Sequence, residues 1–255
     1  MIDLIPSPAE TLSGRINTLI DHALEVDNAA EPPRDYLGGS IMGEECLRYL
    51  WFKIRAPEYA KPFAGRFVRR TRLGHAHEEI TRGWMKRIGF IFEPTGSPRL
   101  EWEVAFKRGR TAGHVDGLLL GGPADLPFPV LWEHKIMKAE YWREAKKNGV
   151  AVSHPTYHAQ CVIYADRTKT NGTLFMALNT DTSELHAEFV KPDPGMANAL
   201  FMRADKVIAA NTEHDVPRIA VRETDFKCKW CDFRDHCWRP QERAAAPTIL
   251  PEWAR

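Results

Sequence analysis

The sequence has no hydrophobic run near the roughly 20 residues that a membrane-spanning helix needs. Its start, MIDLIPSPAE, lacks the basic and apolar regions of a signal peptide. It also lacks an excess of charge, because 35 lysines and arginines accompany 34 aspartates and glutamates. This balance excludes a strongly basic protein that coats nucleic acid, although it allows a local basic groove. We expect a cytoplasmic protein with no membrane partner, and the sequence identifies no protein partner.

Internal repeats and low-complexity segments are absent as well. The 255 residues are 44% hydrophobic and 27% charged, which is typical of a globular protein of one or two domains. We predict a single domain over residues 1–255. Its expected parts are a helical N-terminal part (1–65), a core (66–211), a cysteine-containing segment (212–240) and a tail (241–255).

Cysteine is scarce, and the number of cysteines is odd. Three of the five, Cys228, Cys231 and Cys237, fall within the segment CKWCDFRDHC. In a chain without a secretion signal, this spacing favours metal or cluster ligation over a disulfide framework. Cys161 is surrounded by apolar residues, so we expect it to be a small buried hydrophobic side chain.

Hydrophobic periodicity predicts an α/β protein with a mixed central sheet flanked by helices. Three successive strands are expected between Glu101 and Lys138, and a strand pair is expected in NGTLFMALN and ELHAEFV. The helix expected from about Arg72 to Ile88 carries an apolar stripe of Leu73, Ala76, Ile80, Trp84 and Ile88. The other expected helices span residues 8–28, 43–54, 138–149, 155–167 and 193–211.

The segment VLWEHK ends an apolar strand with an acid and a base. Side chains alternate between the two faces of a strand, so Glu133 and Lys135 share one face while His134 points to the other. Asp116 precedes Glu133 by a spacing that places it on the neighbouring strand, where the two carboxylates can converge. Two carboxylates suit a hard divalent cation. A surface ion pair is the plainer alternative.

This order of residues resembles the PD-(D/E)XK nuclease superfamily, and Gln160 with Tyr164 resembles the Gln-x-x-x-Tyr signature of its RecB-type branch. The resemblance implies a restriction-endonuclease-like core and a Mg²⁺- or Mn²⁺-dependent deoxyribonuclease. Asp116 and Glu133 would hold the metal, and Lys135 would orient or deprotonate the attacking water. Gln160 and Tyr164 would shape the site or contact DNA.

A further metal ligand is expected upstream, because members of this branch place a histidine or glutamate four residues after a glycine. Counting from Gly74 gives Glu78, whereas His77 falls one residue short and lies within the apolar stripe, where a core histidine is expected. The resemblance therefore implies Glu78 as a ligand, with His77 as the alternative. It also implies that the backbone carbonyl of His134 ligates the metal.

The three C-terminal cysteines, together with Cys46, resemble the ligands of iron-sulfur nucleases from CRISPR adaptation, bacterial recombination and phages. The resemblance implies a four-iron, four-sulfur cluster that joins the N- and C-terminal parts. A zinc site remains open, formed by four cysteines or by three cysteines and His236.

Two basic segments flank the expected metal site in the sequence and suit a DNA substrate, although solvated surface charge explains them equally well. Their members are Arg66, Arg69, Arg70 and Arg72, and Lys138, Arg143, Lys146 and Lys147. Tyr141 and Trp142 are candidates for stacking on unpaired bases, or for the core.

Taken together, the patterns predict a DNA exonuclease that acts on ends or single strands in recombination, repair or phage DNA processing. Two other classes stay open. One is a non-catalytic nucleic-acid-binding module with the nuclease fold, and the other is a zinc-stabilised interaction domain.

Overall fold

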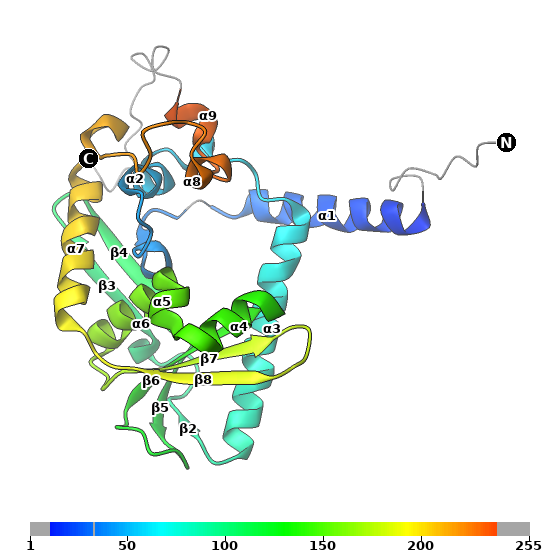
Figure 1. Ribbon diagram of the computed structural model, residues 1–255, viewed down its shortest axis with the longest axis vertical. Helices are drawn as coiled ribbons and strands as arrows, with labels where there is room; N and C mark the ends of the chain where they lie inside the picture. Colours follow the sequence, from blue (N-terminus) through cyan, green and yellow to red (C-terminus); the bar gives the residue numbers. More distant parts are fainter. Residues whose placement is uncertain (1–10, 33, 239–255) are drawn as a thin grey trace.

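The computed structural model of the protein describes residues 11–32 and 34–238. The helices, shown in Figure 1, are α1 (Leu12–Ala30), α2 (Leu47–Arg55), α3 (Gly65–Arg87), α4 (Ala139–Asn148), α5 (Val150–Ser153), α6 (Pro155–Thr168), α7 (Pro194–Ala209), α8 (Phe226–Lys229) and α9 (Arg234–Cys237). The strands are β1 (Leu37–Gly38), β2 (Ile91–Phe92), β3 (Glu101–Phe106), β4 (Gly109–His114), β5 (Gly117–Gly121), β6 (Val130–Met137), β7 (Thr173–Asn179) and β8 (Leu185–Val190).

The strands form two sheets. The larger has the order β2-β5-β6-β7-β8, in which β6 and β7 are parallel and the other neighbours are antiparallel. The smaller has the order β1-β4-β3. Parallel neighbours need a crossover connection, and α4, α5 and α6 provide it between β6 and β7. The predicted α/β class, with a mixed sheet flanked by helices, is confirmed.

The central strand β6 lies between helices on both of its faces. Thr81 of α3 contacts the His134 ring on one face, and Gln160 of α6 contacts Glu133 on the other. The side chains of Leu131, Trp132 and Glu133 are fully buried, and the neighbouring strand β7 is buried along its whole length. A strand covered on both faces has a continuous hydrophobic run rather than an alternating pattern, as VLW shows.

Helix α3 begins at Gly65, seven residues earlier than expected, and it buries a different face. Its predicted apolar stripe is exposed, with Leu73 55%, Ile80 46% and Trp84 48% accessible. The buried face instead includes Thr81 and Arg82, because these polar side chains find partners on His134 and on the backbone carbonyl of Asp116. The expectation that this stripe faces the core was wrong.

The segment AGHVDGLLLG is not one strand. It divides at Val115 and Asp116 into β4, which belongs to the smaller sheet, and β5, which belongs to the larger one. The region predicted to hold three strands therefore holds four. Asp116 lies at the point where the chain passes between the sheets.

Helix α1 extends away from the rest of the molecule and packs on α3 (Figure 1). A side chain at Gly65 would overlap α1, since its Cβ would lie 2.3 Å from the Cα of Asp21. Arg69 pairs with Asp21 at 2.9 Å, and the Gly65 amide donates to Glu25. Polar contacts therefore hold α1, and none of its residues is buried.

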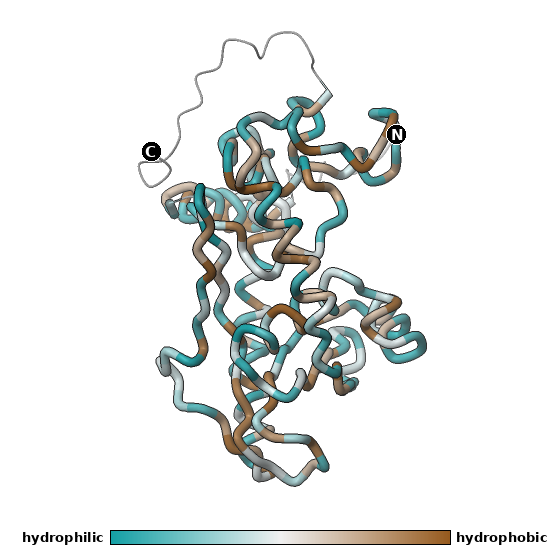
Figure 2. The backbone as a smooth tube through the Cα atoms, turned by 90° about the vertical axis from the view of Figure 1, so that its left-hand side faces the viewer, coloured by the Kyte–Doolittle hydropathy of each residue, from teal (hydrophilic) through white to brown (hydrophobic). Residues whose placement is uncertain are grey.

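None of the described helices is both long and apolar enough to cross a bilayer. Figure 2 shows hydrophilic and hydrophobic stretches alternating along the backbone. The predicted division into an N-terminal part, a core and a cysteine segment stays a prediction. The tail at 241–255, and the last residues of the cysteine segment, lie outside the described residues.

Candidate active site and cysteine cavity

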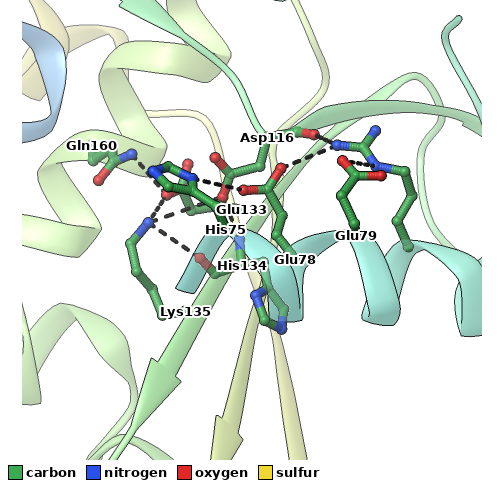
Figure 3. A network of polar contacts seen from close by, with 9 residues as sticks. His75, Glu78, Glu79, Asp116, Glu133, His134, Lys135 and Gln160 are labelled. Atoms are coloured by element: carbon green, nitrogen blue, oxygen red, sulfur yellow. Dashed lines mark hydrogen bonds and ion pairs between the residues drawn. The ribbon is translucent and has the colours of Figure 1, made fainter. Parts of the chain in front are cut away.

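Glu133 and Lys135 lie on the same face of β6, as expected from strand alternation. The Lys135 ammonium donates to the Glu133 carboxylate and lies 4.0 Å from Oδ2 of Asp116 (Figure 3). Burial acts to lower the pKa of Lys135, but the two carboxylates outweigh it, so the pKa is raised and the amine is protonated. Lys135 thus supplies a positive charge between two acids.

Asp116 is positioned by its place between the two sheets. Its Oδ2 accepts a hydrogen bond from the His134 amide at 2.8 Å, and its own carbonyl accepts one from Arg82. The following residue, Gly117, pairs with Trp132 in the β5–β6 ladder. The ladder therefore fixes Asp116, which directly precedes β5, beside Glu133 of β6.

Glu78 approaches this pair from α3, and its carboxylate accepts a hydrogen bond from Arg82 at 3.1 Å. Figure 3 shows Glu78, Asp116 and Glu133 directed toward one another. Burial raises the pKa of Glu78 to about 7, and the charge of Asp116 adds to this effect. Burial likewise raises the pKa of Glu133 to about 8, again with a contribution from Asp116.

The two candidate residues on α6 have different surroundings. Gln160 is buried and donates to Oε1 of Glu133 at 2.7 Å. Tyr164, one turn further on, packs edge-on against Trp102 with ring centroids 5.5 Å apart. Burial raises the pKa of Tyr164, and the charge of Glu133 contributes to this shift. Gln160 therefore contacts Glu133 directly, whereas Tyr164 packs against Trp102 of β3.

The His134 ring points away from the acids and lies 3.1 Å from Thr81 Oγ1. Burial, with Lys135 and His77, lowers the pKa of His134 to about 4, so the ring is neutral. Its backbone carbonyl instead faces the site, where it accepts from Lys135 at 3.2 Å. His77 is half-buried, and its Nδ1 is buried without a hydrogen-bond partner among the described residues.

Sequence reasoning missed two residues of this site. Arg82 holds both Glu78 and the Asp116 carbonyl, and its spacing of four residues from Glu78 on a helix was the available signal. His75, which is largely exposed, places Nδ1 3.9 Å from the Glu78 carboxylate. The His75 ring therefore lies near the Glu78 carboxylate, and the choice between Glu78 and His77 as a metal ligand stays a prediction.

The site has an orphaned acceptor. Oε2 of Glu133 is buried and has no hydrogen-bond partner among the described residues. A buried carboxylate oxygen without a partner carries a large desolvation cost, which a cation would remove. No group of three or more His, Cys, Asp or Glu side chains in the described chain is arranged to hold a metal ion.

The pH dependence of stability tests the environment of Glu78. Its pKa is about 7 in the folded protein against an ordinary value of 4.5. The stabilisation of the folded state by Glu78 is therefore fully present below pH 4.5, and it is lost as the pH rises through 7. In EDTA, the contribution of Glu78 to the free energy of unfolding should fall over this range by about 3 kcal/mol at most, and the raised pKa of Glu133 adds to the fall. The fall should be smaller in Glu78→Gln, as measured by urea denaturation.

Asp205, an exposed acid on α7, provides the matched control for this experiment. Asp205→Asn should keep the wild-type pH profile. Equal profiles for Glu78→Gln and the wild-type protein would show that Glu78 ionises as an ordinary surface acid.

The four candidate ligand cysteines come together from both ends of the chain. One cavity is lined by Cys46, Cys228, Cys231 and Cys237, along with Tyr49 and Phe52. Cys46 precedes the first turn of α2, and the adjacent Arg48 donates two hydrogen bonds to the Val216 carbonyl, at 3.1 and 3.0 Å. His236 stacks on Tyr59 with centroids 4.2 Å apart, and it does not line this cavity.

Three of the thiols that line the cavity are affected by its apolar surroundings. Burial raises the pKa of Cys228, Cys231 and Cys237, and for Cys231 the value is about 11. Neutral thiols are poor metal ligands, so a bound cation would have to displace the protons. Cys161 is fully buried in the core, as predicted.

The basic segments differ in how far they are neutralised. On α3, Arg69 pairs with Asp21 and Arg72 pairs with Asp27 at 3.1 Å, so these two bind α1. The cations of the second segment are exposed and form no ion pair within the described residues, namely Lys138, Arg143, Lys146 and Lys147. Tyr141 is 53% exposed, whereas Trp142 is buried and donates to the Ala177 carbonyl.

No protein-family model and no curated protein matches the sequence. Among solved structures, two of the alkaline exonuclease LHK-Exo from Laribacter hongkongensis, one in complex with dAMP, align with 69% of this chain and with 88% and 87% of theirs. Their identities are 14% and 13%, each with a TM-score of 0.47. The crystal structure of SSO0001 aligns with 89% of this chain and 98% of that one, at 13% identity and a TM-score of 0.54. At this identity the likeness is one of fold, and the chain shares its overall fold with SSO0001.

Proposed function

We propose that this protein is a metal-dependent nuclease that hydrolyses phosphodiester bonds of DNA. The observation that carries the proposal is the mutual influence of Glu78, Asp116 and Glu133, with the Lys135 ammonium beside Asp116 and Glu133 and a buried oxygen of Glu133 left without a partner among the described residues. Acids that raise one another's pKa in this way are typical of functional sites rather than of surface ion pairs.

The chemistry of the donor atoms suits a hard divalent cation such as Mg²⁺ or Mn²⁺, although the described side chains are not arranged as a ready-made metal site. All the donors are oxygens, from Glu78, Asp116, Glu133 and the His134 carbonyl. When bound, the cation would polarise the phosphodiester and lower the pKa of a bound water. Lys135 would offset negative charge on the phosphate, and Gln160 would hold Glu133 in place through its hydrogen bond.

We further propose that the enzyme acts as an exonuclease on free ends or single strands, in recombination, repair or phage DNA processing. The support for this finer assignment is the resemblance of the sequence motifs. The alternative of a non-catalytic nucleic-acid-binding module is disfavoured by the contacts, because three acids and a lysine held together without a reaction would only destabilise the fold.

The proposal is tested by digestion of end-labelled single- and double-stranded DNA, each blocked or unblocked at its ends. We expect hydrolysis with Mg²⁺ or Mn²⁺ and none in EDTA, and the product pattern will give the polarity. The proposal fails if neither metal supports degradation and if Asp116→Ala and Lys135→Ala both behave like the wild-type protein.

We also propose that Cys46, Cys228, Cys231 and Cys237 hold one metal centre, a four-iron, four-sulfur cluster with a structural role. The support is their shared cavity, which brings together four sulfur donors suited to iron or zinc. The position of His236 against Tyr59 disfavours a site of three cysteines and one histidine. Zinc on four cysteines is the remaining alternative.

Anaerobically purified protein should be brown, with broad absorption near about 400 nm and roughly four iron atoms per chain. Cys231→Ser should lose most of the iron, whereas Cys161→Ser, which alters a core cysteine, should keep it. A colourless protein containing one zinc ion would replace the cluster with a zinc site and would favour an interaction domain. A protein free of both metals would contradict the metal centre.

A further inference from the structure

Three aromatic rings lead outward from Lys135, and we name them the aromatic track. The Lys135 ammonium lies 5.5 Å from the centroid of the Tyr157 ring. The His154 ring stacks on Tyr157, with centroids 5.5 Å apart and an interplanar angle of 9°. Tyr141 then meets His154 edge-on, with centroids 6.2 Å apart. The track thus runs from the candidate active site through α6 to α4.

Exposure increases along the track. Tyr157 and His154 are half-buried, and Tyr141 is 53% exposed. Tyr157 precedes Gln160 by three residues on α6, so both occupy the face that looks toward Glu133. The buried Trp142, and not Tyr141, attaches α4 to the sheet, through its hydrogen bond to the Ala177 carbonyl. An exposed ring in this position is available to a ligand.

The chemistry of the track suits unpaired nucleobases. Burial lowers the pKa of His154, so its ring is neutral and can stack as a flat apolar surface. Exposed cations on and before α4 can follow a phosphate backbone, namely Lys138, Arg143, Lys146 and Lys147. Bases in a duplex are already stacked on their neighbours, so only an unpaired base offers its face to such rings.

We propose that the aromatic track binds the unpaired bases of a single-stranded DNA end and thereby directs its phosphodiester toward the acidic site. This inference rests on the proposed nuclease function, and it assigns the preference for single strands to Tyr141, His154 and Tyr157.

Binding is measured without hydrolysis, in EDTA, by fluorescence anisotropy of a labelled oligothymidylate of about 12 nucleotides and of a duplex of equal length. Tyr141→Ala should weaken binding of the single strand by about 5- to 20-fold and of the duplex by less than about 2-fold. Tyr141→Phe keeps the ring face and should bind like the wild-type protein. Trp84→Ala, which removes a ring of similar exposure (48%) on α3, should change neither affinity.

Photocrosslinking locates the contact independently of affinity. An oligothymidylate containing 5-iododeoxyuridine should crosslink to Tyr141, His154 or Tyr157, as identified by mass spectrometry of the peptides. Crosslinks confined to other exposed rings, such as Phe226 and Trp230 (76% and 72% exposed), would overturn the proposal. So would an unchanged affinity of Tyr141→Ala for the single strand.

The two proposals fail in different ways. If the protein binds single strands through the track but no metal supports hydrolysis, the nuclease function fails and the track stands. If hydrolysis occurs and Tyr141→Ala leaves the ratio of single- to double-strand cleavage unchanged, the track fails and the nuclease function stands.

Discussion

Asp116→Ala is expected to lower DNA hydrolysis by about 10³-fold or more, because it removes a carboxylate from the centre of the site. The Asp116 charge raises the pKa of both Glu78 and Glu133, so it is the acid that couples to each of the others. Its loss should weaken binding of Mn²⁺, as measured by electron paramagnetic resonance, and it should lower the pKa of both remaining acids. The rate is measured on end-labelled DNA at saturating metal.

Asp205→Ala is the matched control, because Asp205 is an exposed acid on α7. It should leave both the rate and the Mn²⁺ affinity unchanged. Circular dichroism should show that both variants are folded. If Asp116→Ala retained activity within about tenfold of the wild-type protein, Asp116 would not contact the reacting group or its metal.

Removing the Lys135 ammonium should have the largest effect on stability. Lys135→Met leaves the fully buried Glu133 and its neighbour Asp116 without their shared cation. Breaking a buried pair by removing one partner costs about 3 to 5 kcal/mol. We expect this loss in the free energy of unfolding in EDTA, and partial recovery on addition of Mn²⁺, because a bound cation replaces the missing charge.

Lys61→Met tests a pair in a different setting, since Lys61 and Asp235 are both more than half exposed. Its cost should stay below about 1 kcal/mol. A loss of similar size in the two variants would mean that Lys135 behaves as a surface charge. Recovery with Mn²⁺ in neither the wild-type protein nor Lys135→Met would argue against a metal at this position.

Strand alternation was enough to predict the arrangement within β6. It placed Glu133 and Lys135 together and His134 opposite them, because a period of two residues is a property of the extended backbone itself. The motif spacing brought Gln160 to the same site, where it contacts Glu133. The alternation of side chains along β6 is a local property, and the position of Gln160 follows from the order of the motifs. Both can be read from a sequence.

Helix α3 shows where sequence reasoning fails. Its apolar residues predicted one buried face. The face that is buried in fact depends on which partners the neighbouring strands provide. Here β6 offers the His134 ring, and the start of β5 offers the Asp116 carbonyl, so Thr81 and Arg82 are buried instead of Ile80 and Trp84. Long-range polar partners of this kind leave no periodic trace. The division of AGHVDGLLLG between two sheets was missed for the same reason.

The meeting of Cys46 with Cys237 in one cavity has a consequence for synthesis on the ribosome. The hydrogen bonds from Arg48 of α2 to Val216, and the stacking of Phe52 on Phe233, cannot form until the segment that holds Val216 and Phe233 has emerged. During translation, the apolar side chains of α2 therefore stay exposed to solvent while the ribosome synthesises the strands that follow α2 in the sequence. This interval is when a nascent chain is most prone to aggregate, and when a chaperone has the most surface to hold.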